Sequence, residues 1–158
     1  MLRRLIGEQI RVEVDLDVAG LTILGTDCEG AKVDLESIIE QSPNALGAQV
    51  ALGRINFAEQ DWDALSESGT RLKETLPDNP MGTYLQGVAL QRQGRHLEAI
   101  EAFEQALALQ PDAKTAYNLG VSAGRAKQWD TAVAAYDQAL ELAPENTSYL
   151  SEYGDALA

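Results

Sequence analysis

The chain has 158 residues, of which 45% are hydrophobic and 23% charged, and this size and composition suffice for one domain with a buried core. Its formal net charge of −13 would on average repel nucleic-acid phosphates and anionic lipid surfaces, so neither is expected as a partner. Because no apolar run approaches the roughly 18 residues of a membrane-spanning helix, we expect no insertion into a membrane.

Residues 1–29 are predicted to be an irregular or degenerate N-terminal segment. Between residues 10 and 18, apolar side chains alternate with charged ones, a pattern typical of a strand or of an edge that pairs with another copy. Residues 1–10 lack the apolar core of a secretory signal, so we expect a cytoplasmic location, or a periplasmic one if the sequence is trimmed. The single cysteine, Cys28, permits neither an internal disulfide nor a cysteine-based metal site.

Residues 30–41 are predicted to be the second helix of a degenerate repeat. Ala31, Leu35, Ile38 and Pro43 have the same offsets as a set of residues further along the chain: Ala99, Phe103, Ala106 and Pro111. An apolar stripe at this spacing, followed by a proline that ends the helix, is typical of an amphipathic helix in a larger array.

From residue 44 onward the sequence repeats. Glycines recur at spacings of 34, 33 and 34, and a proline follows each of the first three by 24 residues: Gly53, Gly87, Gly120 and Gly154; Pro77, Pro111 and Pro144. A fixed period of this length indicates stacked supersecondary units. We expect repeats at 44–77, 78–111 and 112–145, a capping helix at 146–158, and one repeat domain over 30–158.

Residues 112–145 read DAKTAYNLGVSAGRAKQWDTAVAAYDQALELAPE and resemble the tetratricopeptide repeat family, in particular its bacterial members. The unit of this family is a helix, a tight turn and a second helix. The resemblance implies an all-α, right-handed superhelical solenoid of antiparallel helix pairs.

The glycines within the helices predict close helix contacts, since a helical glycine costs roughly 1 kcal/mol relative to alanine. We expect Ala99 and Ala132 to be the small partners across the contacts of Gly87 and Gly120. Gly69 stands where later repeats have aromatic residues, so the second helix of the first repeat should be the least well packed. The turn glycine, Gly94, is replaced by Lys127 in the third repeat.

The resemblance also implies that the first helix of each repeat lines the inner surface. It places there Val50, Arg54 and Phe57, then Met81, Tyr84, Leu85, Val88, Gln91 and Arg92, and finally Lys114, Tyr117, Asn118, Val121 and Arg125. Our candidate peptide-binding residues are Arg54, Tyr84, Val88, Gln91, Arg92, Lys114, Tyr117, Asn118, Val121 and Arg125. These inner positions include four basic residues and no acidic one, which favours a carboxylate-bearing or acidic partner. Alternatively, the bases merely offset neighbouring acids.

One subset of the family clamps the C-terminal carboxylate of chaperone tails with lysine and asparagine. The first-repeat positions hold Val50 and Arg54 and the second-repeat position holds Leu85, so only Lys114 and Asn118 are compatible with such a clamp. We therefore expect an extended segment or an amphipathic helix instead.

No catalytic set is recognisable. The sequence has no phosphate loop, no histidine pair at metal-ligand spacing, and no serine or cysteine with a credible histidine partner. Its glutamates lie at helix-surface spacing, and His96 occupies a turn position that holds tryptophan in the flanking repeats. We expect no enzyme activity, no cofactor and no metal, and interpret the chain as a protein interaction scaffold.

Two other functions stay open. The C-terminal residues are similar to repeat domains of bacterial cytochrome c maturation factors, which favours an assembly chaperone for cytochrome maturation or secretion. Residues 2–16 resemble the stretch leading into the ATP-binding domain of sensor histidine kinases, although no nucleotide motif follows, and so suggest a fragment of a signalling enzyme. The apolar residues of 146–158 suggest either that the protein continues beyond residue 158 or that this terminal helix meets another copy of the chain.

Overall fold

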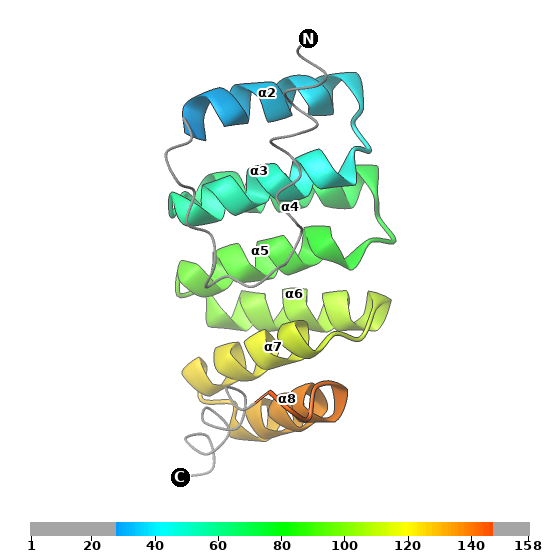
Figure 1. Ribbon diagram of the computed structural model, residues 1–158. Helices are drawn as coiled ribbons and strands as arrows, with labels where there is room; N and C mark the ends of the chain where they lie inside the picture. The colour runs from blue at the N-terminus through cyan, green and yellow to red at the C-terminus, as the bar shows by residue number, and fades with distance from the viewer. Residues whose placement is uncertain (1–27, 147–158) are drawn as a thin grey trace.

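The computed structural model describes residues 28–146, and the helices of this part of the chain confirm an all-α repeat fold (Figure 1). The helices are α2 (Cys28–Gln41), α3 (Leu46–Ala58), α4 (Trp62–Thr75), α5 (Pro80–Arg92), α6 (His96–Leu109), α7 (Ala113–Arg125) and α8 (Trp129–Leu142). The strand-like pattern at 10–18 and all but the first residue of the expected capping helix lie outside the described residues.

The helices stack in chain order, each against the next, as Figure 1 shows. The first helices of successive pairs also touch, since α3 contacts α5 and α5 contacts α7. Within the described residues, the backbones of α4 and α6, and those of α6 and α8, do not approach closely, although Lys73 Nζ of α4 donates a hydrogen bond to Gln105 Oε1 of α6 at 3.4 Å. An array whose first helices are close together and whose second helices are apart curves toward the first helices, so α3, α5 and α7 form its inner side.

Local signals explain where the helices begin and end. The carboxylate of Asp61 accepts a hydrogen bond from the Ala64 amide at 3.0 Å, Asn79 caps α5 at Met81 N, and Asp112 caps α7 at Thr115 N. A proline stands two residues beyond the last residue of each second helix, where the helix cannot continue: Pro43, Pro77, Pro111 and Pro144.

The turn within each of the three pairs contains one residue with a positive φ angle. Gln60, Gly94 and Lys127 have φ values of 59°, 77° and 61°, in the left-handed region that favours glycine. Lys127, which replaces the turn glycine in the third repeat, therefore has a strained left-handed backbone, and so does Gln60.

In the second and third pairs, an aromatic ring of the second helix packs against a glycine of the first helix. A Cβ on Gly87 would lie 2.7 Å from Cε1 of Phe103, and a Cβ on Gly120 would lie 2.7 Å from Cε1 of Tyr136. The expected close contacts exist, but the nearest groups are these rings rather than Ala99 and Ala132, because the rings fill the space beside each glycine.

The first pair is joined differently. The expectation that its second helix is the least well packed holds for the contact of α4 with α3, which is less extensive than the contacts within the later pairs, but not for its contact with α5. Leu65 and Leu72 of α4 are fully buried. A Cβ on Gly69 would lie 2.7 Å from the carbonyl oxygen of Gly82, so the backbones of α4 and α5 come into direct contact there. Gly69 lacks an aromatic side chain because α5 occupies that space.

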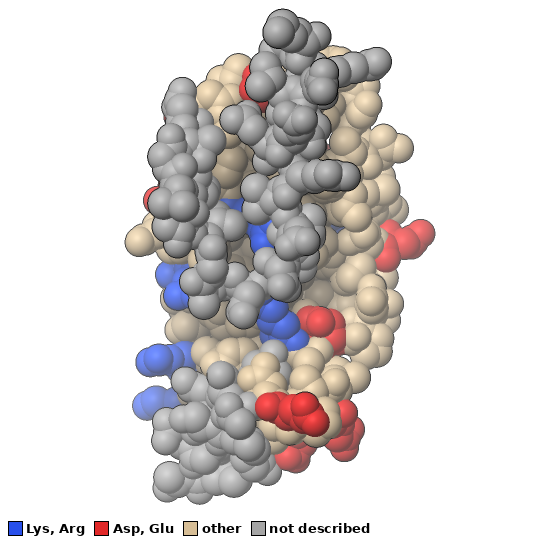
Figure 2. All heavy atoms as spheres, viewed as in Figure 1, with Lys and Arg blue, Asp and Glu red and all other residues tan. Residues whose placement is uncertain are grey.

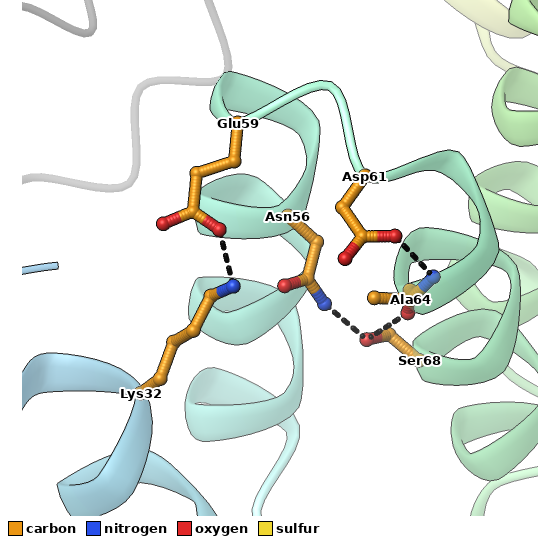
Figure 3. Close-up of polar contacts among 6 residues, drawn as sticks. All are labelled: Lys32, Asn56, Glu59, Asp61, Ala64 and Ser68. Carbon is orange, nitrogen blue, oxygen red and sulfur yellow. Dashed lines mark hydrogen bonds and ion pairs between the residues drawn. The ribbon is translucent and has the colours of Figure 1, made fainter. Parts of the chain in front are cut away.

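The helix expected at residues 30–41 is present as α2. Leu35 and Ile39 of α2 are buried in a small cluster with Leu52 and Ile55 of α3. Figure 3 shows the polar contacts beside this cluster, where Lys32 of α2 forms an ion pair with Glu59.

Candidate functional site

Charge is divided between the two sets of helices. The first helices, α3, α5 and α7, contain four basic residues and no acidic one: Arg54, Arg92, Lys114 and Arg125. The second helices, α4, α6 and α8, contain nine acidic residues and only two basic ones. Because the first helices form the inner side of the array, the inner side is basic within a chain that is acidic overall.

Figure 2 shows this face of the molecule. Lys and Arg side chains lie in its middle and along its left side, whereas Asp and Glu side chains are prominent toward its right and lower edges. An Asp or Glu side chain also lies beside the central Lys and Arg side chains in this view, so positive charge predominates in the middle of this face without excluding acidic groups.

The structure places nine of the ten candidate residues at least partly at the surface. Arg92 and Arg125 are exposed, and seven others are half-buried: Arg54, Tyr84, Gln91, Lys114, Tyr117, Asn118 and Val121. We call these nine residues the inner face.

Val88 does not belong to the inner face. Its side chain is only 7% exposed and lies in the main hydrophobic core. Val50 and Leu85, also expected at inner positions, are each 8% exposed and belong to the same core. One turn of a first helix packs against both neighbouring helices, so these apolar side chains are enclosed and unavailable to a partner.

The two tyrosines of the inner face are held by rings beneath them. Tyr84 packs against Phe103 with ring centroids 6.0 Å apart, and Tyr117 packs against Tyr136 at 5.9 Å. Both pairs are tilted by 53°. The tyrosines therefore present rigid, half-buried apolar surface beside the basic groups.

Polar side chains lock α5 to α7. The side-chain amide nitrogen of Gln91, Nε2, donates to the backbone carbonyl oxygen of Asn118 at 3.1 Å and to the side-chain hydroxyl of Ser122 at 2.9 Å. The amide nitrogen of Asn118 donates to the hydroxyl of Tyr84 at 3.3 Å. Gln91 and Asn118 thus position two helices of the inner face, a role that the sequence pattern did not reveal.

An aromatic group orients Arg92. Its guanidinium carbon lies 5.3 Å from the centroid of the Phe57 ring on α3, and Phe57 meets Trp62 edge-on at 5.5 Å. Phe57 was expected at an inner position but was not among the candidate binding residues. The contact spans about one repeat, so only the stacking of α3 beside α5 brings the two residues together.

Other chemistry finds no support in the described residues. Residues 28–146 contain no group of three His, Cys, Asp or Glu side chains that could hold a metal ion. No helix among them is both long enough and apolar enough to cross a membrane. His96 is the first residue of α6, and its buried Nδ1 has no hydrogen-bond partner within this part of the chain.

Comparison with known proteins agrees with this architecture. A family model described as tetratricopeptide repeat matches residues 48–114, 84–146 and 117–158. No match was found among curated proteins.

Several solved structures share the fold at low sequence identity. MamA is 22% identical, with a TM-score of 0.74 over 82% of this chain and 77% of that one. TTC0263, a thermophilic TPR protein of Thermus thermophilus, is 21% identical, with a TM-score of 0.70 over 82% and 73%. The first TPR of Spaghetti (RPAP3), bound to the HSP90 peptide SRMEEVD, is 20% identical, with a TM-score of 0.64 over 84% and 94%.

Proposed function

This chain belongs to the tetratricopeptide repeat family, and we propose that it is a protein interaction scaffold whose inner face binds an acidic segment of a partner protein. The observation that carries this proposal is the division of charge between the helices. The four basic residues of α3, α5 and α7 together produce a positive electrostatic potential, because these helices contain no acidic residue that would offset it.

The two exposed arginines are suited to this role. Among the described residues, the ion pairs involve Lys32, Arg71 and Arg95, and neither Arg92 nor Arg125 takes part in one. Offsetting of neighbouring acids therefore does not account for these two. A guanidinium can bind a carboxylate through two parallel hydrogen bonds, which makes arginine a specific carboxylate receptor.

The chemistry differs from that of a carboxylate clamp. Spaghetti (RPAP3) binds the acidic HSP90 peptide SRMEEVD on the same fold. In this chain, two of the clamp positions implied by the family resemblance hold Val50 and Leu85, which are core residues. We therefore propose recognition of acidic side chains along a segment rather than capture of a terminal carboxylate.

An assembly chaperone would use the same face but would favour one unfolded client. A panel of unrelated acidic peptides separates the two functions, since a chaperone of this kind binds one client far better than the rest. No described residue supports a signalling enzyme, whose basis is residues 2–16. A cytoplasmic location stays a prediction.

Charge reversal on the inner face tests the proposal. Selection from a display library of random short peptides should enrich acidic sequences, and Arg92→Glu with Arg125→Glu should weaken their binding by at least roughly tenfold, because each charged hydrogen bond contributes about 1.5–3 kcal/mol. Titration calorimetry measures the affinity, and circular dichroism should show unchanged helicity.

The matched control is Arg71→Glu with Lys73→Glu on α4, which changes the net charge equally on the outer side. It should leave the affinity within about twofold, because charges more than about 10 Å away are largely screened at 0.1 M salt. Enrichment of neutral or basic peptides, or an equal loss in both double variants, would refute binding at the inner face.

A further inference from the structure

The N-terminal segment carries a charge pattern complementary to the inner face, and the scaffold function does not account for it. Within residues 11–18, Arg11, Glu13, Asp15 and Asp17 alternate with Val12, Val14, Leu16 and Val18, so the segment carries a net charge of −2. We infer that this segment binds the inner face of its own chain in an extended conformation, an inference that rests on the proposed function. A partner must then displace it.

The alternation places the charged and the apolar side chains of this segment on opposite sides of an extended chain. In an extended chain successive side chains point to opposite sides, so the three carboxylates share one side with Arg11, and the valines and leucine share the other. The carboxylates are then about 6.6 Å apart. Basic side chains of the inner face come from the three first helices, α3, α5 and α7, and packed helix axes lie about 8–10 Å apart. This spacing is larger than that of the carboxylates, but arginine and lysine side chains are long enough to reach them.

No other described surface offers the same attraction. The second helices contain nine acidic residues and two basic ones, and α2 contains four acidic residues and one lysine. An acidic segment is repelled by these helices, so the charge pattern directs it to α3, α5 and α7. The half-buried rings of Tyr84 and Tyr117 supply apolar surface beside the charges.

The segment is also within reach. Asp17 lies 11 residues before Cys28, where α2 begins. An extended chain covers at most about 3.3–3.6 Å per residue, so the connection can span roughly 35–40 Å and pass α2 and α3 to reach α5. Tethering also raises the effective concentration of the segment into the millimolar range, so modest intrinsic affinity suffices for occupancy.

The test uses the full-length chain and a labelled synthetic peptide of residues 8–18, EQIRVEVDLDV, as the probe. One variant neutralises the segment with Glu13→Gln, Asp15→Asn and Asp17→Asn. Its control neutralises three exposed carboxylates of α2 with Asp34→Asn, Glu36→Gln and Glu40→Gln, and so changes the net charge equally.

The segment variant should bind the probe at least about tenfold more tightly than the wild type, because the competing tethered copy is gone. The α2 control should bind it as the wild type does. Adding Arg92→Glu and Arg125→Glu to the segment variant should abolish the gain. Circular dichroism verifies that all variants keep their helicity.

Equal probe affinity for wild type and segment variant would overturn the inference but leave the proposed function standing. Absence of probe binding to every variant would also overturn it, while the peptide library still judges the proposed function independently. A gain in affinity accompanied by dissociation of wild-type dimers, seen by light scattering, would overturn intramolecular docking in favour of a second copy as the occupant.

Discussion

The first helix pair and the two later pairs reach the same fold through different joints. In the pairs α5–α6 and α7–α8, an aromatic ring lies against a glycine of the facing helix. In the pair α3–α4, Gly53 faces Leu65 and Leu85, and the position of the ring is taken by Gly69, which touches α5. A repeat that lacks the aromatic residue therefore has a less extensive contact within its own pair, and its second helix packs closely against the next pair instead.

The first pair compensates with a buried polar contact. The amide of Asn56 on α3 donates to the hydroxyl of Ser68 on α4 at 3.1 Å, and that hydroxyl donates to the carbonyl oxygen of Ala64 at 2.9 Å (Figure 3). Asn56 and Ser68 are each only 4% exposed. These hydrogen bonds satisfy polar groups whose burial would otherwise be costly. Because hydrogen bonds depend on direction, they also fix the orientation of α3 relative to α4 more strictly than apolar packing does.

The largest effect should come from filling the glycine contact of α4. Gly69→Leu should cost about 3 kcal/mol or more of unfolding free energy, because the added side chain meets the backbone of α5, which cannot turn aside. Gly120→Leu should cost about 1–3 kcal/mol, because the Tyr136 ring can shift. Urea denaturation followed by circular dichroism measures both.

Gly124→Leu is the control for these two variants, because a Cβ at Gly124 would have no atom within 4 Å. It should be neutral or stabilising, since leucine is a better helix former than glycine. If Gly69→Leu proved as mild as this control, the close contact between α4 and α5 would be refuted.

A smaller effect should follow from breaking the polar joint of the first pair. Asn56→Ala should cost about 1–2 kcal/mol through loss of the buried hydrogen bond and of side-chain volume. Ser68→Ala in the same background should add less than it costs alone, since the two groups share one contact. Strict additivity in this double-mutant cycle would show that the hydrogen bond does not couple α3 to α4.

The smallest changes in unfolding free energy should come from substitutions in the turns, because there the repeats differ only in which residue adopts the positive φ angle. Lys127→Gly should stabilise the third repeat by up to about 1 kcal/mol, because glycine adopts the φ of 61° without strain. Gly94→Ala should destabilise the second repeat by a similar amount. Gly124→Ala, in an ordinary helical position, should have the opposite sign to Gly94→Ala. Equal signs at Gly94 and Gly124 would contradict the turn geometry.

Parts of the inner face were predictable because charge is visible in a sequence. The bases of the first helices follow from the repeat alignment, and their helices contain no acidic residue. The roles of Gln91 and Asn118 were not predictable, because the hydrogen bonds of Gln91 join residues 27 and 31 positions apart in the chain. The ring beneath Arg92 was missed for the same reason.

The sequence by itself determined the period, the all-helical pairs and their ends, because glycines, caps and prolines act on the backbone within a few residues. Only the tertiary structure decided that Val88 is core, that Gly69 is a contact rather than a defect, and that Phe57 orients Arg92. Each of these depends on how one helix pair packs against the next. That packing joins residues distant in the sequence, such as Gly69 with Gly82 and Phe57 with Arg92, which no local pattern specifies.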